Sequence, residues 1–311
     1  MGEAFSELMK RIKAGKFVYT GELEPHKSTE IAEVVEWART LKATGKIIAA
    51  NVTDNPQSVG AISSLAASYI IQKDAGLEVI YQLRTSDRNR LALVSDLLGA
   101  SLLGIRNVLA LTGDHIKKGD TPQSMSVHDL DGTQLVDLIH KMVYEGKDLS
   151  GNEIHGPRPQ FNIGAAGNPN FEPVEAEALK LERKAKVGVD FFQTQVVFDV
   201  NTALRFLDAI EHLGVPVLIG IFPPKSLGQA EYFDEFVPGV RVPEEFLEKF
   251  KKFKDLPDKK ERKAKITEYN IEYFADFVKE VQKKPVCKGI HIMAVGYPEV
   301  IGPIIESAEK G

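Results

Sequence analysis

Phe17-Val-Tyr-Thr-Gly-Glu-Leu23 begins a pattern that the rest of the chain repeats and that indicates its fold. It is an apolar run of strand length, and a stretch from Ser28 to Ala43 with apolar residues at helical spacing follows it. Ser28 and Thr29 offer a side-chain cap for the start of that helix. The first unit of the chain is therefore predicted to be a strand followed by a helix.

More units of the same kind follow. The remaining strands are expected at residues 46–52, 77–83, 107–111, 161–166, 191–197, 215–222 and 289–295. The helices after them are expected at residues 58–73, 88–103, 132–144, 174–187, 202–213, 226–236 and 298–308. A lysine-rich helical insertion around residues 243–283 comes before the last strand.

Strands that alternate with helices run parallel, because each crossover returns the chain to the same edge of the sheet. The apolar runs lack strict alternation, which indicates strands covered on both faces. Eight such units in 311 residues favour the α/β class and a closed (β/α)8 TIM barrel. An open doubly wound sheet is the alternative, but no G-x-G-x-x-G motif follows the first strand. Since no composition break marks a linker, residues 1–311 are predicted to form a single catalytic domain.

Composition limits the functions that this barrel can have. The 39 Lys and Arg residues against 44 Asp and Glu residues give a formal net charge of −5, so nothing favours binding to nucleic acid or to an anionic membrane surface. The single cysteine, Cys287, excludes a disulfide framework or an all-thiolate metal site within this chain. No apolar stretch approaches the roughly 20 residues of a membrane helix, and residues 1–16 lack the apolar region of a secretory signal. We therefore expect a cytoplasmic protein.

The carboxyl ends of the strands carry the active site of a barrel, so polar residues should collect there. His291, in the last strand, is expected to be a hydrogen-bonded core histidine rather than a metal ligand, because no second His or Cys lies at ligand spacing nearby. No metal site is predicted. The polar residues at the strand ends are Glu22, Glu24, Asn51, Thr53, Asp54, Asn55, Gln82, Thr112, Gly113, Asp114, Asn168, Gln195, Lys225 and His291.

Glu22 is the first candidate for chemistry. Its neighbours on the strand are apolar, so its carboxyl is partly removed from water, which favours the protonated form that a general acid needs. A glutamate paired with a lysine at the barrel mouth is the structural alternative, and Glu24 is the competing acid. Gly113 would let a flat or phosphorylated ligand approach the backbone, although Gly-Asp also marks ordinary turns.

Two charged segments have ordinary structural explanations. Glu177, Arg183 and Lys184 belong to a charged helix over residues 172–186, and such charges are typical of a solvated face. The lysines of residues 249–265 are interleaved with phenylalanines, which favours an amphipathic surface helix over an anion site.

Several motifs, in order along the barrel, together resemble the methylenetetrahydrofolate reductase family. They are Glu22-Leu-Glu-Pro25, Val52-Thr53, Leu111-Thr-Gly-Asp114, Arg183-Lys184 ahead of Gln195-Val-Val-Phe-Asp199, and Gly220-Ile-Phe-Pro-Pro224. The resemblance runs from about Phe17 to Val295. It implies a flavin-containing (β/α)8 barrel that reduces 5,10-methylenetetrahydrofolate to 5-methyltetrahydrofolate in one-carbon metabolism.

The resemblance also implies roles for the residues that match the family's motifs. Glu22 would be the general acid that protonates folate N10, so that the ring opens to an iminium ion able to accept hydride from the reduced flavin. Asp114 would lie between flavin and pterin and stabilise the cationic intermediate. Gln195 would pair with the pterin, and Lys225 would lie on the substrate side, where the family has a glutamine.

The same resemblance gives the residues that would contact the flavin. Arg183 and Lys184 suit a flavin phosphate. Thr112 and Gln82 stand where familiar bacterial members have arginine and histidine, and Leu227 stands where they have an aromatic residue. These changes leave FAD and FMN both open as the cofactor. The implied flavin contacts are Thr53, Gln82, Thr112, Gly113, Asp114, His128, Asn168, Glu177, Arg183 and Lys184.

This divergent form looks like the reductases of anaerobic, acetogenic-type metabolism. The likeness implies a catalytic subunit in an oligomer, with folate as substrate and with NAD(P)H or a partner subunit carrying iron–sulfur or zinc as the electron donor. Two alternatives stay open from the residues. One is a flavin-free pterin- or folate-dependent barrel enzyme such as a methyltransferase, and the other is a scaffold subunit of a larger complex.

Overall fold

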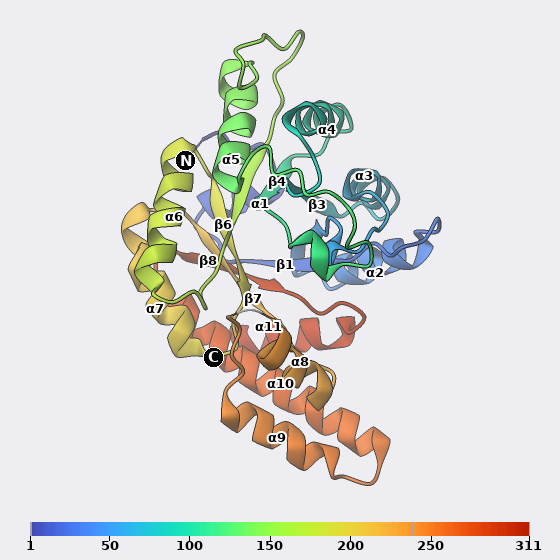
Figure 1. Cartoon of the computed structure of the whole chain (residues 1–311). Helices are drawn as coiled ribbons and strands as arrows, with labels where there is room; N and C mark the ends of the chain where they lie inside the picture. Colours follow the sequence, from blue (N-terminus) through green and yellow to red (C-terminus); the bar gives the residue numbers. More distant parts are fainter. Residues whose placement is uncertain (1, 238, 311) are drawn as a thin grey trace.

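The computed structural model describes residues 2–237 and 239–310, and its centre is a closed barrel of parallel strands (Figure 1). Each strand pairs with the next along the chain, and the last pairs with the first to close the ring. The predicted single-domain TIM barrel is confirmed, and the open sheet is excluded. The strands are β1 (Val18–Leu23), β2 (Ile47–Val52), β3 (Glu78–Arg84), β4 (Asn107–Leu111), β5 (Asn162–Gly167), β6 (Phe191–Val196), β7 (Val217–Ile221) and β8 (Cys287–Ile292).

Helices surround the barrel and follow the strands, as predicted. Short 3₁₀ turns η1 (Pro56–Ser58), η2 (Ile116–Lys118), η4 (Glu211–Leu213) and η5 (Pro298–Val300) interrupt the connections, and a π-helical turn η3 (Lys141–Glu145) continues α5. The helices that follow strands are α2 (Ala32–Ala43), α3 (Ser64–Asp74), α4 (Arg90–Leu102), α5 (Gly132–His140), α6 (Val174–Val187), α7 (Val200–Ile210), α8 (Leu227–Phe236) and α11 (Ile301–Glu309).

Two of these helices begin later than the sequence predicts. Ser28 does not cap α2, because its Oγ accepts the N–H of Glu30 in a local turn and the helix begins at Ala32. In front of α3, residues Gln57 and Ser58 have positive φ angles, which a right-handed helix does not allow. Both delays lengthen loops at the carboxyl ends of β1 and β2, which is the end where a barrel carries its site.

A helix that the sequence analysis did not predict, α1 (Glu7–Lys13), precedes the first strand. Ser6 caps it by accepting the N–H of Met9, and the Asn162 side chain accepts the N–H groups of Phe5 and Ser6. Leu8 and Met9 are fully buried in a cluster with Val18, Ile80 and Leu109 from the strands. This helix therefore covers the amino-terminal end of the barrel interior.

The lysine-rich segment forms two helices, α9 (Glu244–Lys254) and α10 (Lys259–Gln282), which lie side by side and extend away from the barrel (Figure 1). Phe246 and Phe250 are buried, and both rings pack against Tyr269 of α10. The lysines between residues 249 and 265 are exposed. No helix in the described part of the chain is both long enough and apolar enough to cross a membrane.

Candidate active site

A cavity of about 330 Å³ opens among the carboxyl ends of the strands. Its volume lies at the lower end of the range of roughly 300–1,000 Å³ that small-molecule sites occupy. The structure brings five of the predicted site residues together here, and three further polar residues join them. The predicted residues are Glu22, Gln82, Asn168, Glu177 and Gln195, and the additional ones are Gln193, Thr194 and His291.

Glu22 reaches the cavity from the end of β1, where its carboxyl contacts a buried histidine. Glu22 Oε2 lies 3.4 Å from Nε2 of His291, and the two side chains are 17% and 1% exposed. Closure of the barrel makes β1 and β8 neighbours, with Thr20 opposite His291 in the register. Among the described residues, Glu22 is thus paired with a histidine and not with the lysine of the structural alternative.

His291 is buried, as predicted, and it also lines the cavity; the sequence analysis placed it at a strand end but gave it no role in the site. Its Nδ1 lies 3.1 Å from Oγ1 of Thr20, and its Nε2 lies 3.3 Å from Nδ2 of Asn51. The sequence signal was present, because His291 is the titratable residue in an otherwise apolar strand end. Its contact with Glu22 could not be predicted from the sequence, because β1 and β8 become neighbours only when the barrel closes.

Glu24, the competing acid, does not line the cavity. Burial raises the pKa of Glu24, and the charge of nearby Glu22 raises it further. The two carboxyls are therefore close neighbours, but Glu22 is the one that a molecule in the cavity can contact.

Glu177 of α6 also lines the cavity and is buried, at 5% exposure. Its Oε1 accepts the backbone N–H of Asn168 at 2.9 Å, and its Oε2 lies 3.3 Å from Nζ of Lys180. Glu177 thus belongs to the cavity wall. The sequence analysis had favoured a solvated helix face for this residue. Its carboxylate fixes the loop that follows β5.

Three amide side chains line the cavity: Gln82 from β3, and Gln193 and Gln195 from β6. The sequence analysis missed Gln193, although it lies two residues before Gln195 and alternation along a strand would place both on one face. Gln193 Oε1 is buried and makes no hydrogen bond within the described residues. This oxygen can accept a hydrogen bond from a ligand.

Arg183 and Lys184 of α6 do not line the cavity. Lys184 approaches it, because its Nζ donates to the carbonyl of Ala166, a lining residue, at 2.7 Å. Burial lowers the pKa of Lys184, and the opposing charge of Glu177 does not compensate. Arg183 is exposed.

Four more predicted residues lie beyond the cavity lining. Thr53 is buried just after β2, and its Oγ1 has no hydrogen-bond partner among the described residues. Thr112 and His128 are exposed, and His128 has a φ of 43°. Lys225 Nζ donates to the carbonyls of Val295 and Gly296, each at 3.2 Å.

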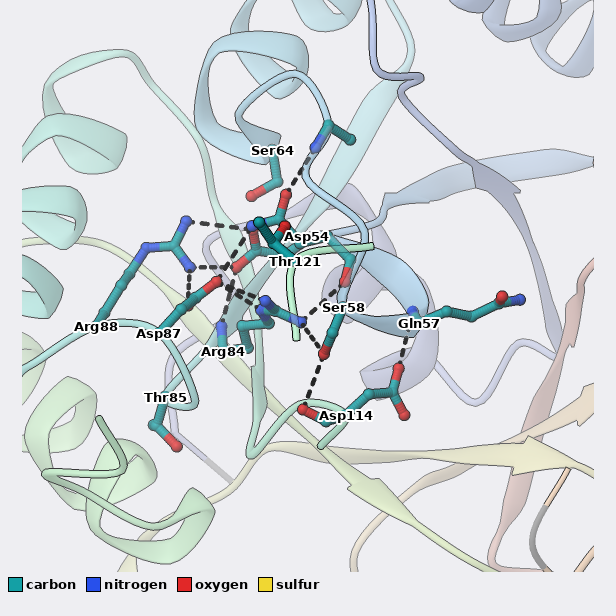
Figure 2. A network of polar contacts seen from close by, with 12 residues as sticks. Asp54, Gln57, Ser58, Ser64, Arg84, Thr85, Asp87, Arg88, Asp114 and Thr121 are labelled. Carbon is teal, nitrogen blue, oxygen red and sulfur yellow. Dashed lines mark hydrogen bonds and ion pairs between the residues drawn. The ribbon is translucent and has the colours of Figure 1, made fainter. Parts of the chain in front are cut away.

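Asp114 is exposed and turned toward the loop after β2 (Figure 2). Its carboxylate accepts the N–H of Gln57 at 2.9 Å, and its carbonyl accepts Oγ of Ser58 at 3.0 Å. Gly113 has a φ of +90°, and a Cβ there would lie 2.6 Å from Oγ of Ser86. The φ of +90° is one that side chains rarely adopt, so the backbone itself favours glycine here, independently of any ligand.

A network of charged side chains, partly or fully buried, packs against these loops (Figure 2). Arg84 pairs with Asp87 at 2.6 Å and donates to the carbonyl of Asn55, while Arg88 bridges Asp54 and Asp87 at 2.7 and 2.9 Å. Burial alone would lower the pKa of Arg88, but the two carboxylates outweigh it and raise that pKa. Each charge in the network has a partner of opposite sign, which makes its burial tolerable.

The chemistry of the cavity follows from this donor set. A carboxyl held by a buried histidine can give a proton to a heteroatom of a bound ring, and surrounding amides can hydrogen-bond the edges of that ring. Within residues 2–237 and 239–310, no group of three or more His, Cys, Asp and Glu side chains is arranged to hold a metal ion.

Comparisons with known proteins match the whole barrel. Residues 7–309 match the profile of the family described as methylenetetrahydrofolate reductase. "Methylenetetrahydrofolate reductase 1" of Schizosaccharomyces pombe is 24% identical over 253 residues, which are 77% of this chain and 38% of that protein. "5,10-Methylenetetrahydrofolate reductase" of Escherichia coli K12 is 30% identical over 146 residues, 45% of this chain and 42% of that protein. The chain thus spans less than half the length of these curated relatives.

Among solved structures, a crystal structure of 2,3-dimethylmalate lyase matches with a TM-score of 0.53 and 11% sequence identity, covering 100% of this chain and 86% of the other. At that identity the likeness concerns the fold alone.

Proposed function

We infer the activity from one premise: the chain belongs to the methylenetetrahydrofolate reductase family. We propose that it reduces 5,10-methylenetetrahydrofolate to 5-methyltetrahydrofolate with a bound flavin. The observation that carries the proposal is Glu22, a carboxyl at the barrel mouth, held by His291 and facing a cavity lined with amides. That donor set suits protonation of a folate nitrogen.

The residues at the mouth fit the ring systems that this reaction needs. Gln193 Oε1 and Thr53 Oγ1 are buried polar atoms without partners in the described chain, and buried polar atoms normally have one. Amides such as Gln82 match the alternating donors and acceptors of a flavin or pterin edge. A reduced flavin, when bound, supplies the hydride.

Proton donation is the task of Glu22. We propose that it protonates N10 of the folate, which opens the five-membered ring to a more electrophilic iminium ion. Its low exposure limits the contact of the carboxyl with competing water. Gln195 and Gln193 would hold the pterin by hydrogen bonds to its edge, and Lys225 would lie toward the remainder of the folate.

Asp114 has a supporting role in this proposal. Its carboxylate would stabilise positive charge on the substrate, and the N–H of Gln57 holds it at the end of β4. Lys184 and Arg183, at the end of α6, would lie toward the flavin phosphate. Thr112, Gly113, His128, Asn168 and Glu177 are proposed to complete the flavin site.

The flavin can be FAD or FMN, and the electrons can come from NAD(P)H or from a partner subunit with iron–sulfur or zinc. We propose that the chain acts as the catalytic subunit of an oligomer. The lone cysteine is compatible with such a cluster being carried by another chain. Mass spectrometry of the cofactor released from purified protein identifies the flavin.

The function is tested with purified, flavin-loaded protein reduced by dithionite under anaerobic conditions. Addition of 5,10-methylenetetrahydrofolate should reoxidise the flavin and yield 5-methyltetrahydrofolate. Reoxidation is seen as the return of the absorbance of oxidised flavin at about 450 nm. A colourless protein that binds no added flavin would favour the methyltransferase alternative. A flavin-loaded protein without turnover would favour the scaffold.

A further inference from the structure

We propose that the helical hairpin of α9 and α10 is a docking arm for an acidic, amphipathic helix of a partner protein. The hairpin extends away from the barrel (Figure 1), and its distal part, residues 249–265, is called the basic tip. The inference does not rest on the proposed function, because the charge and the shape of this surface carry it.

The basic tip concentrates positive charge in an acidic chain. It holds nine Lys and Arg residues against three Asp and Glu residues, which is a net charge of +6. Since the whole chain has a formal net charge of −5, the residues outside the tip carry −11. Charge separated in this way produces a local positive potential, which favours a negatively charged partner.

Most of the lysines of the basic tip lack a counter-charge. All of them are exposed, and three pair with a glutamate at 2.8–2.9 Å. Lysines three or four residues apart on one helix repel each other, and an acidic partner would remove that repulsion. The lysines without a carboxylate within 4.0 Å in the described chain are Lys249, Lys252, Lys254, Lys259 and Lys260.

A shallow, mostly apolar groove of about 570 Å³ lies along α10, where it meets the basic tip. Its lining residues recur at helical spacing, so they share one face of α10. They are Lys260, Lys263, Ala264, Thr267, Glu268 and Ile271. Such a groove accepts the apolar face of an amphipathic helix, and lysines at one end can then meet the carboxylates of that helix.

The groove favours a protein over other anionic partners. A nucleic acid needs the lysines alone, and the charge of −11 outside the tip repels a polyanion that extends beyond it. Insertion into a lipid surface needs large exposed apolar side chains, and residues 249–265 of the described chain present none. An apolar centre beside charged groups is the usual composition of a protein–protein interface.

The groove also adjoins the active-site end of the barrel. Lys263 Nζ lies 2.9 Å from Oε1 of Glu299, and Oγ1 of Thr267 shares a hydrogen bond with Oη of Tyr297. Met293, which begins the same connection after β8, lines the cavity. A helix held in the groove would therefore lie beside the connection that contributes to the mouth.

Binding of a designed probe to the full chain tests the charge of the tip. The probe is a fluorescein-labelled helical peptide of about five turns, with glutamates on one face and leucines on the other. Fluorescence anisotropy at about 50 mM salt should show binding to the wild type. The triple variant Lys252→Glu, Lys259→Glu and Lys260→Glu should bind at least about tenfold more weakly. No binding to the wild type would overturn the proposal.

A second triple variant separates the place of the charge from its amount. Lys10→Glu, Lys16→Glu and Lys310→Glu change the net charge equally, at exposed lysines outside the arm. This variant should bind the peptide as the wild type does. Equal weakening by the two triple variants would show attraction without a docking place and would overturn the proposal.

The role of the groove is tested on the unaltered protein. A peptide with serines in place of the leucines should bind the wild type at least about tenfold more weakly, because it has no apolar face to bury. Ala264→Gln, which fills the groove without adding charge, should weaken binding of the leucine peptide. Equal binding of the two peptides, or tighter binding of a DNA duplex of equal charge, would overturn the proposal.

Cross-linking inside the cells that make this protein identifies the natural occupant. The photo-reactive residue p-benzoylphenylalanine replaces Ala264 in the full chain, and mass spectrometry identifies what it captures. We expect a protein of net negative charge, and we expect the charge reversal of the basic tip to abolish its capture. A cross-link to nucleic acid, a capture that survives the charge reversal, or no capture at all would overturn the proposal.

Discussion

Glu22 and His291 are 269 residues apart in the chain, and the last pairing of the barrel brings them into contact. The contact places a carboxyl with low exposure at the edge of a polar cavity. At that edge the carboxyl lies within reach of a substrate bound in the cavity. At the scale of the residue, the proposed chemistry depends on this pair.

Glu22→Gln should remove folate reduction and leave reduction of the flavin by its donor close to wild type, because only the folate half-reaction needs a proton. We expect a loss of roughly 10²- to 10⁴-fold in the rate at which methylenetetrahydrofolate oxidises the reduced enzyme. Stopped-flow absorbance measures the two half-reactions separately. Glu24→Gln is the matched control, since Glu24 does not line the cavity. A larger loss in Glu24→Gln would identify Glu24 as the acid.

Lys184 is predicted to leave a signature in the pH dependence of stability. Burial lowers its pKa below the ordinary lysine value of 10.5. At pH values between the lowered pKa and 10.5, the unfolded chain binds a proton at Lys184 that the folded chain does not bind, so stability rises with pH in this window. The contribution of Lys184 to stability is therefore complete above pH 10.5 and is lost as the pH falls through the lowered pKa. The Tm of the flavin-free wild type should therefore rise with alkaline pH relative to that of Lys184→Met. Lys186 has an exposed side chain, so Lys186→Met should have the same dependence of Tm on pH as the wild type.

At the scale of the elements, the loops after β2 and β3 are held as one unit by the charge network of Asp54, Arg84, Asp87 and Arg88. The backbone N–H of Arg84 also donates to Asp54 at 3.1 Å, which ties the end of β3 to the loop after β2. The loop with Asp114 rests on that unit through Gln57 and Ser58. The network thus determines where Asp114 lies.

Removing one partner from this network should be costly. Arg88→Met leaves Asp54 buried without its main counter-charge, and breaking a buried pair in this way costs about 3–5 kcal/mol of the free energy of unfolding. Urea denaturation measures the loss. Arg39→Met removes an arginine from a pair in which both side chains are more than half exposed, and it should change stability little. Similar effects of the two substitutions would contradict the role assigned to the network.

At the scale of the whole molecule, the barrel is covered at one end and open at the other. The helix α1 buries Leu8 and Met9 among inward-facing residues of β1, β3 and β4, while the cavity with Glu22 lies at the carboxyl ends of the strands. Stability and chemistry are therefore assigned to opposite ends of the barrel, as in other enzymes with this fold.

Leu8→Ala tests this division. The side chain is fully buried, and its truncation should cost about 2–5 kcal/mol of the free energy of unfolding, because a cavity is left behind. Leu102→Ala is the control, since Leu102 is 88% exposed and such changes usually stay within about 0.5 kcal/mol. Flavin binding by folded Leu8→Ala should be unchanged. A large loss of flavin affinity would show that the two ends of the barrel are coupled.

The strands and most helices could be predicted from the sequence because they are recorded in local patterns. A strand covered on both faces needs an apolar run such as that of Val217–Ile221, and a helix over a barrel needs an apolar stripe such as that of α7. The exceptions have local causes too. The Ser28 hydroxyl accepts the N–H of Glu30 in a local turn, so it does not cap α2. The positive φ angles of Gln57 and Ser58 move the start of α3 to a later residue.

The barrel, its order of strands and the polar character of its mouth could be predicted from the amino-acid pattern, because burial imposes periodicities that a single chain reveals. The contact of Glu22 with His291 and the turn of Asp114 toward Gln57 are visible only in the folded structure. Both contacts join residues far apart in the chain, and the first exists only after β1 and β8 have paired to close the ring. No local pattern contains the direction in which a side chain meets a partner from another strand.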